Sequence, residues 1–177
     1  MWAHVGRGAR RLGCGMSPSI LESGLQSSAF GLAVAAGLTG GMTLAFSNFI
    51  MRAFDRLDAS AAVRAMQEIN LTVMNPLFML VFTGTGFIAL GVFVAKYVTV
   101  ERLDPWLLAG TLIYLFGVCA VTAGGNVPLN DALAKVTGET MTATTWRDFA
   151  SPWLTYNHLR TVAAAAASLA FMVAATR

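Results

Sequence analysis

The sequence predicts an all-α integral membrane protein: a bundle of four transmembrane helices with short extramembrane helices in the first and third loops. Two observations lead to this fold class. Of the 177 residues, 56% are hydrophobic and only 12% are charged, against about 25% charged in an ordinary soluble domain. The apolar residues also form long charge-free blocks, whereas a soluble fold alternates them with polar positions. Lipid is therefore the expected solvent for most of the chain.

Four blocks are long enough to cross a hydrocarbon core about 30 Å thick, which needs roughly 20 apolar residues in a helix. They run from Ser28 to Met51, from Leu71 to Ala95, from Pro105 to Gly124, and from Arg160 through the alanine-rich segment to Thr176. The last block is the least hydrophobic because alanine dominates it. These blocks predict the four membrane-spanning helices.

The domain boundary is expected near residue 28. Residues 28–177 form the four-helix domain, and residues 1–27 form a disordered or interfacial leader. Glu22 interrupts the leader, and the apolar run after it is too long for the core of a signal peptide. With four spans, the two termini lie on one side of the membrane, and the loops 52–70 and 126–160 lie together on the other.

The basic residues do not predict which way the bundle is oriented in the membrane. Six lie on the side of the termini and six on the opposite side, namely Arg7, Arg10, Arg11, Lys96, Arg102 and Arg177 against Arg52, Arg56, Arg64, Lys135, Arg147 and Arg160. The excess of lysine and arginine that marks cytoplasmic loops is thus missing. The same scatter, with a formal charge of +3, gives no basic stripe for nucleic acid.

Helix formers and glycines predict the finer structure. Residues 60–67 favour a short helix in the first loop, and Pro128 suits the first turn of another in the third loop. Gly124 and Gly125 predict a flexible break at the end of the third span. Gly37 and Gly41 form a small-xxx-small pair, which is typical of closely packed membrane helices. Gly84, Gly86, Gly91, Gly110 and Gly117 add further points of close approach.

Metal chemistry has little support in the sequence. The two histidines, His4 and His158, are far apart, and the acidic residues form no cluster with ligand spacing. Cys14 and Cys119 likewise have no spacing that indicates a disulfide framework or a zinc site. We therefore predict no bound metal.

Polar side chains gather where the two long loops meet the spans on the side opposite the termini. They are Gln67, Asn70, Asn75, Asn126, Asn130, Trp153, Tyr156, Asn157, His158 and Arg160. Helical spacing places Trp153, Asn157 and Arg160 along one stripe, with Tyr156 beside Arg160. This arrangement predicts a polar pocket at one membrane face.

A structural interpretation of the same residues stays open. Tryptophan and tyrosine are common at membrane interfaces, and Arg160 can extend its charge toward lipid head groups. Buried asparagines in a bundle bond between helices, so each amide can serve as structural glue. His158 can be an interfacial histidine with its polar edge in water.

Four segments of the chain resemble the anthrone-oxygenase-like family, which comprises small four-helix membrane proteins. They are Met66-Gln67-Glu68-Ile69-Asn70, Met74-Asn75-Pro76, Asn126-Val127-Pro128-Leu129-Asn130, and Trp153 with Asn157-His158-Leu159-Arg160-Thr161, in the order that the family shows. The resemblance covers roughly residues 28–175. Some members are associated with oxidising anthrones to anthraquinones, and most are bacterial proteins, so the resemblance implies a multi-pass protein of the bacterial plasma membrane.

The function implied is a membrane-embedded, cofactor-independent oxygenase acting on a hydrophobic aromatic, anthrone-like substrate. An anthrone has an acidic C–H bond, and its enolate can itself donate an electron to dioxygen. On this hypothesis His158 is the base, and Arg160 and Asn157 stabilise the oxyanion. The substrate is oriented by Gln67, Asn70, Asn75, Asn126, Asn130, Trp153 and Tyr156.

The alternative is non-enzymatic: a small membrane subunit or scaffold that binds a lipid, a quinone or a partner helix. This hypothesis requires no base, and it predicts loss of folding or assembly when Asn70, Asn126 or Asn157 is changed. In either case the expected partners are the lipid bilayer and, in the cell, further copies of the chain or a larger membrane complex.

Overall fold

The computed structural model describes residues 18–100 and 102–177, and within them the chain is helical, with no strand. Four helical spans are long and apolar enough to cross a membrane. They are Ser23–Phe54, Pro76–Thr99, Pro105–Leu133 and Ala143–Ala175. The predicted fold class, an all-α bundle of four membrane-crossing helices, is confirmed.

Each of the first three spans consists of α-helices joined through π-helical segments. The first contains α1 (Pro18–Ala45), η1 (Phe46–Ile50) and α2 (Met51–Phe54), and α3 (Ala59–Thr72) follows it. The second contains α4 (Pro76–Met79), η2 (Leu80–Gly84) and α5 (Thr85–Val100). The third contains α6 (Pro105–Tyr114), η3 (Leu115–Ala120), η4 (Thr122–Asn126) and α7 (Val127–Leu133). The short 3₁₀ turn η5 (Gly138–Thr140) leads into α8 (Ala143–Ala175), which forms the fourth span.

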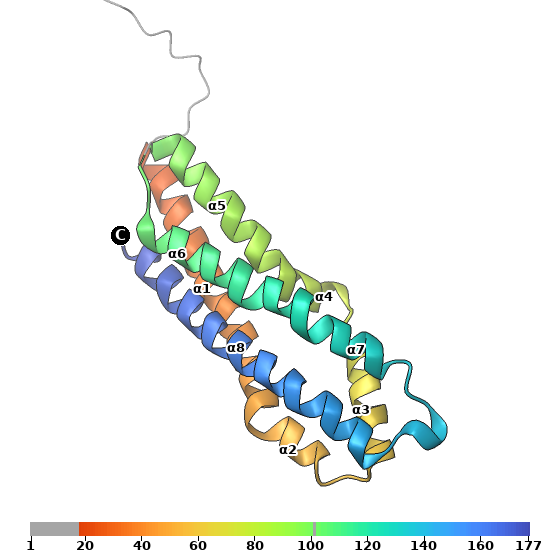
Figure 1. Ribbon diagram of the computed structural model, residues 1–177. Helices are drawn as coiled ribbons and strands as arrows, with labels where there is room; N and C mark the ends of the chain where they lie inside the picture. The colour runs from red at the N-terminus through yellow and green to blue at the C-terminus, as the bar shows by residue number, and fades with distance from the viewer. Residues whose placement is uncertain (1–17, 101) are drawn as a thin grey trace, which may run out of the picture.

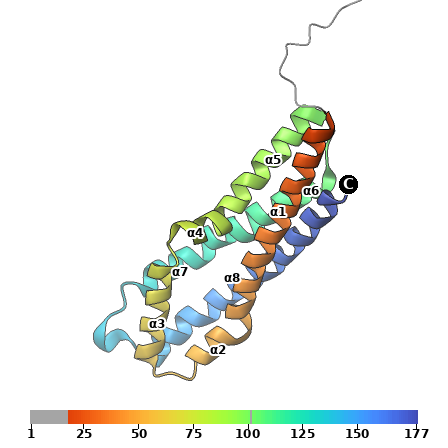
Figure 2. The same ribbon diagram turned by 180° about the vertical axis from the view of Figure 1, so that it is seen from behind.

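The described start of α1 and the C-terminus lie at the same end of the bundle, beside the turn between α5 and α6 (Figure 1). The opposite end is formed by α2, α3, α7 and the start of α8, and the view from behind shows the same grouping (Figure 2). The even number of spans predicts this arrangement. Residues 1–17 of the predicted leader lie outside the described residues, and α1 begins inside the rest of it, at Pro18.

Small residues bring α1 and α8 close together. Ala33 and Ala36 of α1 and Ala167 of α8 are buried, and the Ser168 hydroxyl donates to the Ala33 carbonyl oxygen at 2.8 Å. The predicted pair of Gly37 and Gly41 is only half correct. A Cβ atom on Gly37 would lie 3.4 Å from Ser168 Oγ, whereas nothing lies within 4 Å of one on Gly41.

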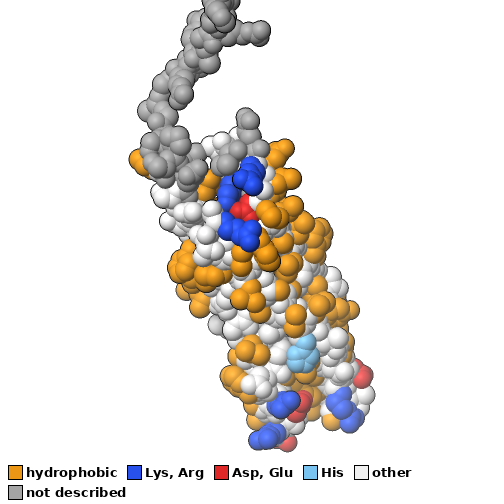
Figure 3. All heavy atoms as spheres, turned by 90° about the vertical axis from the view of Figure 1, so that its left-hand side faces the viewer, with side chains coloured by type: hydrophobic (Ala, Val, Ile, Leu, Met, Phe, Trp, Pro, Cys, Tyr) orange, Lys and Arg blue, Asp and Glu red, His pale blue; other side chains and the backbone are white. Residues whose placement is uncertain are grey.

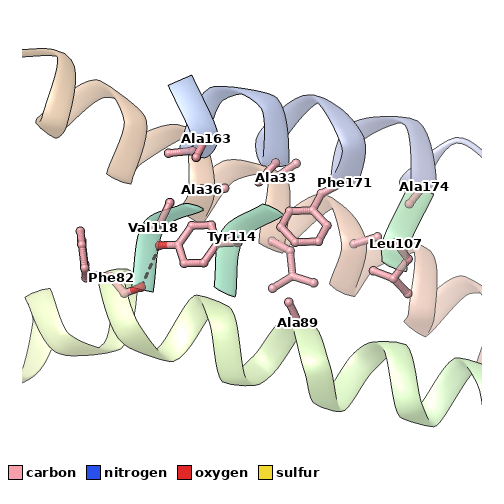
Figure 4. Packing of buried hydrophobic residues seen from close by; sticks show 14 residues of the cluster. Ala33, Ala36, Phe82, Ala89, Leu107, Tyr114, Val118, Ala163, Phe171 and Ala174 are labelled. Atoms are coloured by element: carbon pink, nitrogen blue, oxygen red, sulfur yellow. Dashed lines mark hydrogen bonds between the residues drawn. The ribbon is translucent and has the colours of Figure 1, made fainter. Parts of the chain in front are cut away.

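The hydrophobic core has two parts. One lies between the spans on the side of the termini and centres on Tyr114 and Phe171, both fully buried (Figure 4). The Tyr114 hydroxyl donates to the carbonyl oxygen of Phe82 at 2.7 Å, so the only polar atom of its ring is satisfied. The other part joins α2, α3, α7 and the start of α8 around Met66, Leu133 and Trp146. A polar layer separates the two.

One predicted feature is wrong. The third span continues as helix through Gly124 and Gly125 to Leu133, so the predicted flexible break at these glycines is not formed. The fourth helix contains the predicted apolar block after Arg160 and begins well before it, at Ala143, where the Thr142 hydroxyl accepts a hydrogen bond from the backbone N–H of Thr145 at 3.2 Å. A helix of 33 residues is about 50 Å long, so α8 extends beyond the hydrocarbon core.

Candidate functional site

Asn157 lies in the middle of α8 and is completely buried. Its side-chain amide donates to the carbonyl oxygen of Thr43 at 2.7 Å and to Ser47 Oγ at 2.8 Å, both in the first span. Its oxygen accepts from Arg160 Nη2 at 2.6 Å. All the polar atoms of this amide group are therefore engaged, and the orientation of Asn157 is fixed.

Arg160 follows one turn later on the same face and is only 7% exposed. Besides its bond to Asn157, its Nη1 donates to Thr122 Oγ1 at 3.3 Å. The guanidinium carbon lies 5.3 Å from the centre of the Trp153 ring and 6.0 Å from that of Phe82, so aromatic faces supply part of its electrostatic environment. Its Nε has no hydrogen-bond partner among the described residues.

This buried cation has no carboxylate partner within residues 18–100 and 102–177. The ion pair found in that part of the chain, Lys96 with Asp104, lies near the ends of the second and third spans. Removing an arginine side chain from water costs several kcal/mol unless charge and hydrogen bonds compensate. Two hydrogen bonds to neutral oxygens compensate only partly, so the site favours an anionic or strongly polarised oxygen beside Arg160.

Asn126 and Trp153 form the adjoining wall. The Asn126 amide donates to the backbone carbonyl oxygen of Trp153 at 3.1 Å, while its own Oδ1 is buried and finds no hydrogen-bond partner in the part of the chain that the structure describes. The Trp153 indole N–H donates to Asn130 Oδ1 at 2.9 Å, and its ring packs against Phe46 with centroids 5.5 Å apart. Thus an unpaired acceptor on Asn126 and an unpaired donor on Arg160 both border the same tryptophan residue.

All three neighbouring spans meet this face of α8 through π-helical segments. Ser47 belongs to η1, Phe82 to η2, and Thr122 and Asn126 to η4. In a π-helical turn the backbone hydrogen bonds span five residues instead of four, so the turn is wider than in an α-helix. Such turns occur frequently at functional sites. We define the Arg160 cluster as Ser47, Phe82, Thr122, Asn126, Trp153, Asn157 and Arg160.

Five of the residues singled out in the sequence thus lie together: Asn126, Asn130, Trp153, Asn157 and Arg160. His158 does not join them, although it is on α8, and Tyr156 lies at their edge, against Gly125 of η4. His158 is exposed, and because helical residues are about 100° apart, it lies roughly 160° around the helix from Arg160. Tyr156 is 40% exposed. Its ring packs so closely against Gly125 that a Cβ atom added to this glycine would lie 2.6 Å from it.

Two of the three remaining predicted residues, Gln67 and Asn75, bond at helix ends, and Asn70 does not. Gln67 donates to the carbonyl oxygens of Leu133 at 2.8 Å and Val136 at 3.0 Å, and so ties α3 to the end of the third span. Asn75 is exposed and caps α4, accepting from the N–H of Phe78. Asn70 is half-buried, and its side chain makes no hydrogen bond within the described residues.

Four residues of the site, Thr43, Ser47, Phe82 and Thr122, were not predicted from the sequence. Thr43 and Ser47 lie four residues apart, on one helical face of an otherwise apolar span, and this spacing is a usable signal. Hydroxyl groups in membrane helices often bond to their own backbone, so spacing alone does not identify a site. Nothing in the sequence marks Phe82 among the many aromatic residues.

Replacing Asn157 by leucine is expected to destabilise the bundle by about 2 kcal/mol, because three hydrogen bonds are lost and such bonds in membrane proteins average about 0.6 kcal/mol each. The free energy of unfolding, from titration of detergent-solubilised protein with sodium dodecyl sulfate, measures this change. Asn70→Leu is the matched control and should have little effect. Equal losses in both variants would contradict the assignment of Asn157 as the interhelical contact.

No three histidine, cysteine, aspartate or glutamate side chains gather as a potential metal site among residues 18–100 and 102–177. The polar atoms that the Arg160 cluster offers are instead guanidinium, amide and hydroxyl groups. These groups bind and polarise oxygen atoms of a ligand.

Comparison with known proteins supports a family assignment. No curated protein and no solved structure matches the chain. The family model described as anthrone oxygenase matches residues 73–170, a range that contains η2, η4 and the polar segment of α8. With more than half of its residues matched, the chain belongs to the anthrone oxygenase family.

Proposed function

We propose that the protein is a membrane-embedded oxygenase that binds a hydrophobic aromatic, anthrone-like substrate at the Arg160 cluster. The observation that carries this proposal is a buried guanidinium that, in the part of the chain the structure describes, has no carboxylate partner and no hydrogen-bond partner for its Nε. A substrate that is apolar enough to reach this depth and that becomes anionic during the reaction suits such a site. Family membership supports the same chemistry.

The reaction proposed needs only dioxygen as co-substrate. Loss of a proton from the methylene group of an anthrone gives an enolate, whose negative charge lies largely on oxygen. Transfer of one electron to dioxygen gives a substrate radical and superoxide, which combine to a peroxide at the same carbon. The peroxide oxygen takes up the proton that was removed first, and loss of the second hydrogen from that carbon as a proton, with cleavage of the O–O bond, gives the quinone carbonyl and one water molecule.

In this mechanism Arg160 stabilises the enolate oxygen. A fixed positive charge in a water-excluded site lowers the free energy of an anion far more than it does in water. The bond from Asn157 holds the guanidinium in place, and the ring of Trp153 supplies an aromatic surface beside the charge. Because the enolate is stabilised, a weak base is sufficient to remove the proton from the methylene group.

The proposal is tested with the purified full chain in mild detergent. Addition of anthrone should cause oxygen consumption, with one anthraquinone formed for each dioxygen consumed, as followed by an oxygen electrode and by absorbance. Failure of the folded protein to exceed the rate of a detergent blank would contradict the proposal.

His158 provides a second, independent test. Because its side chain points away from the Arg160 cluster, we expect His158→Ala to retain most of the anthrone-dependent oxygen uptake. A general base typically contributes 100- to 10,000-fold to a rate. Retained oxygen uptake is therefore easily distinguished from the loss of a general base. A loss of this size in a folded variant would show that the histidine predicted as the base does act in the reaction.

The scaffold hypothesis keeps one observation in its favour. Asn157 bonds the fourth span to the first, and Arg160 bonds it to the third, so the polar cluster joins three helices. A scaffold would lose its folded state when these contacts are removed, whereas an oxygenase would remain folded and lose turnover. The Arg160 variant discussed below separates the two.

A further inference from the structure

A second polar site lies at the end of the bundle where the termini meet, far from the Arg160 cluster along the helices. A cavity of about 370 Å³ opens there, lined among others by Gln26, Lys96, Arg102, Leu103, Asp104 and Arg177. These residues come from α1, the end of α5, the turn before α6, and the end of α8. We call it the basic cavity, and Figure 3 shows the cluster of basic side chains around an acidic one at this end.

The charges of the basic cavity are unbalanced. Among its described lining residues, three are basic and one, Asp104, is acidic. Asp104 Oδ2 accepts from Lys96 Nζ at 2.6 Å, and its Oδ1 accepts the backbone N–H groups of Trp106 and Leu107 at 3.0 Å each. Burial disfavours the charged form, but these hydrogen bonds and the charge of Lys96 outweigh it and lower the pKa of Asp104.

Asp104 is therefore ionised, and both of its carboxylate oxygens already accept hydrogen bonds, one from Lys96 and the other from the first turn of α6. The ion pair found at this end, Lys96 with Asp104, involves neither Arg102 nor Arg177, and Arg177 lies over the ring of Trp106 at 5.7 Å. Two guanidinium groups beside one cavity provide the planar, multiply donating surface that phosphate prefers.

The position of the cavity indicates where such a phosphate would come from. Trp106 and Tyr97 are 40% and 51% exposed, as expected for aromatic residues at a membrane interface. Further along α5 and α8 from this end, Val94, Val98 and Leu169 are exposed apolar residues. A headgroup in the cavity would thus have its acyl chains against the outer face of the spans.

We propose that the basic cavity binds the phosphate of an anionic phospholipid, with Arg102 and Arg177 as its ligands. Phosphate is the shared chemistry of a lipid headgroup and of free phosphate ion, and the adjoining apolar surface favours the lipid. The surplus of positive charge selects an anionic headgroup over a zwitterionic one, whose amine it repels. This site is independent of the proposed oxygenase activity.

The test follows the thermal unfolding midpoint of the full chain in detergent, because a ligand that binds the folded state raises it with concentration. The probes are dioctanoyl phosphatidylglycerol, dioctanoyl phosphatidylcholine and sodium phosphate, at constant ionic strength. We expect a saturable rise with phosphatidylglycerol only. The double variant Arg102→Gln with Arg177→Gln should bind it roughly 30-fold more weakly, since each arginine near an anionic membrane surface contributes about 1 kcal/mol.

Arg52→Gln with Arg56→Gln, which removes two exposed arginines from the opposite end, is the matched control and should bind like the unmodified protein. The double variant Arg102→Lys with Arg177→Lys should bind more tightly than the glutamine variant, because it keeps both charges. This comparison separates the loss of charge from altered folding. An equal response to phosphatidylcholine or to sodium phosphate would overturn the anionic-lipid assignment. Unchanged binding by the glutamine variant would overturn the site itself.

Discussion

Replacing Arg160 by methionine is expected to reduce anthrone-dependent oxygen uptake by about 100- to 1000-fold, the usual effect of removing one oxyanion-stabilising donor. The bundle should nevertheless stay folded. Methionine has a similar length and no charge, so it removes the cost of burying a guanidinium that has no carboxylate partner within the described residues. This gain offsets the two hydrogen bonds that Arg160 donates to Asn157 and Thr122. The stability of the variant should therefore lie within about 1 kcal/mol of the unmodified protein.

The measurement combines initial rates from an oxygen electrode with the unfolding midpoint in sodium dodecyl sulfate. Arg147→Met changes an exposed arginine of the same helix and should alter neither quantity. Arg160→Lys keeps the charge but loses the planar fork that contacts Asn157 and Thr122 together, so an intermediate rate is expected.

Two results would contradict the proposal in different ways. Full activity of a folded Arg160→Met variant would remove Arg160 from the mechanism. Loss of the folded state would instead favour the scaffold hypothesis, in which the cluster joins helices. Because the stability and rate measurements are separate, neither result can be mistaken for the other.

The four spans could be predicted from the sequence because charged side chains are so costly in hydrocarbon that their absence from long blocks marks membrane-crossing helices. The helix ends could not be predicted as well. Hydropathy ends a span at its first polar residues, but Asn126 and Asn157 are bonded inside the bundle, so the helices continue through them. The break predicted at Gly124 and Gly125 was wrong for this reason, and the fourth helix begins long before the apolar block that predicted its span.

The candidate site was partly predictable for a related reason. The stripe of Trp153, Asn157 and Arg160 follows from helical spacing along one segment, and the structure keeps it on one buried face. His158 belongs to the same sequence motif but faces away, because adjacent residues of a helix point in different directions. The partners from other spans, such as Ser47 and Phe82, depend on tertiary packing, which a single sequence does not reveal.

Replacing Gly117 by alanine is expected to destabilise the bundle by about 1–3 kcal/mol, the range for overpacking a close contact. The new Cβ atom would lie 2.5 Å from the Cβ atom of Ala163 on α8. Both atoms are fixed directly to helical backbone, so no side-chain rotation can relieve the overlap and the third and fourth spans must move apart. The unfolding free energy in sodium dodecyl sulfate measures the loss.

Gly91→Ala is the matched control. Gly91 also lies within a membrane-crossing helix, but nothing is found within 4 Å of an added Cβ atom. There the same substitution removes only the conformational freedom of glycine, so it should stabilise the protein by roughly 0.5–1 kcal/mol. The two variants should thus shift stability in opposite directions, although both lie in apolar spans and both were expected from the sequence to allow close helix approach.

The Gly117 variant also connects packing with the Arg160 cluster. Ala163 lies one turn after Arg160 on α8, and Gly117 lies little more than one turn before Thr122, which accepts a hydrogen bond from Arg160. Separating the two helices at Gly117 should therefore lengthen that bond and lower the oxygenase rate, whereas Gly91→Ala should leave the rate unchanged. A Gly117→Ala protein as stable as the unmodified one would mean that the third and fourth spans are less closely packed than this contact requires.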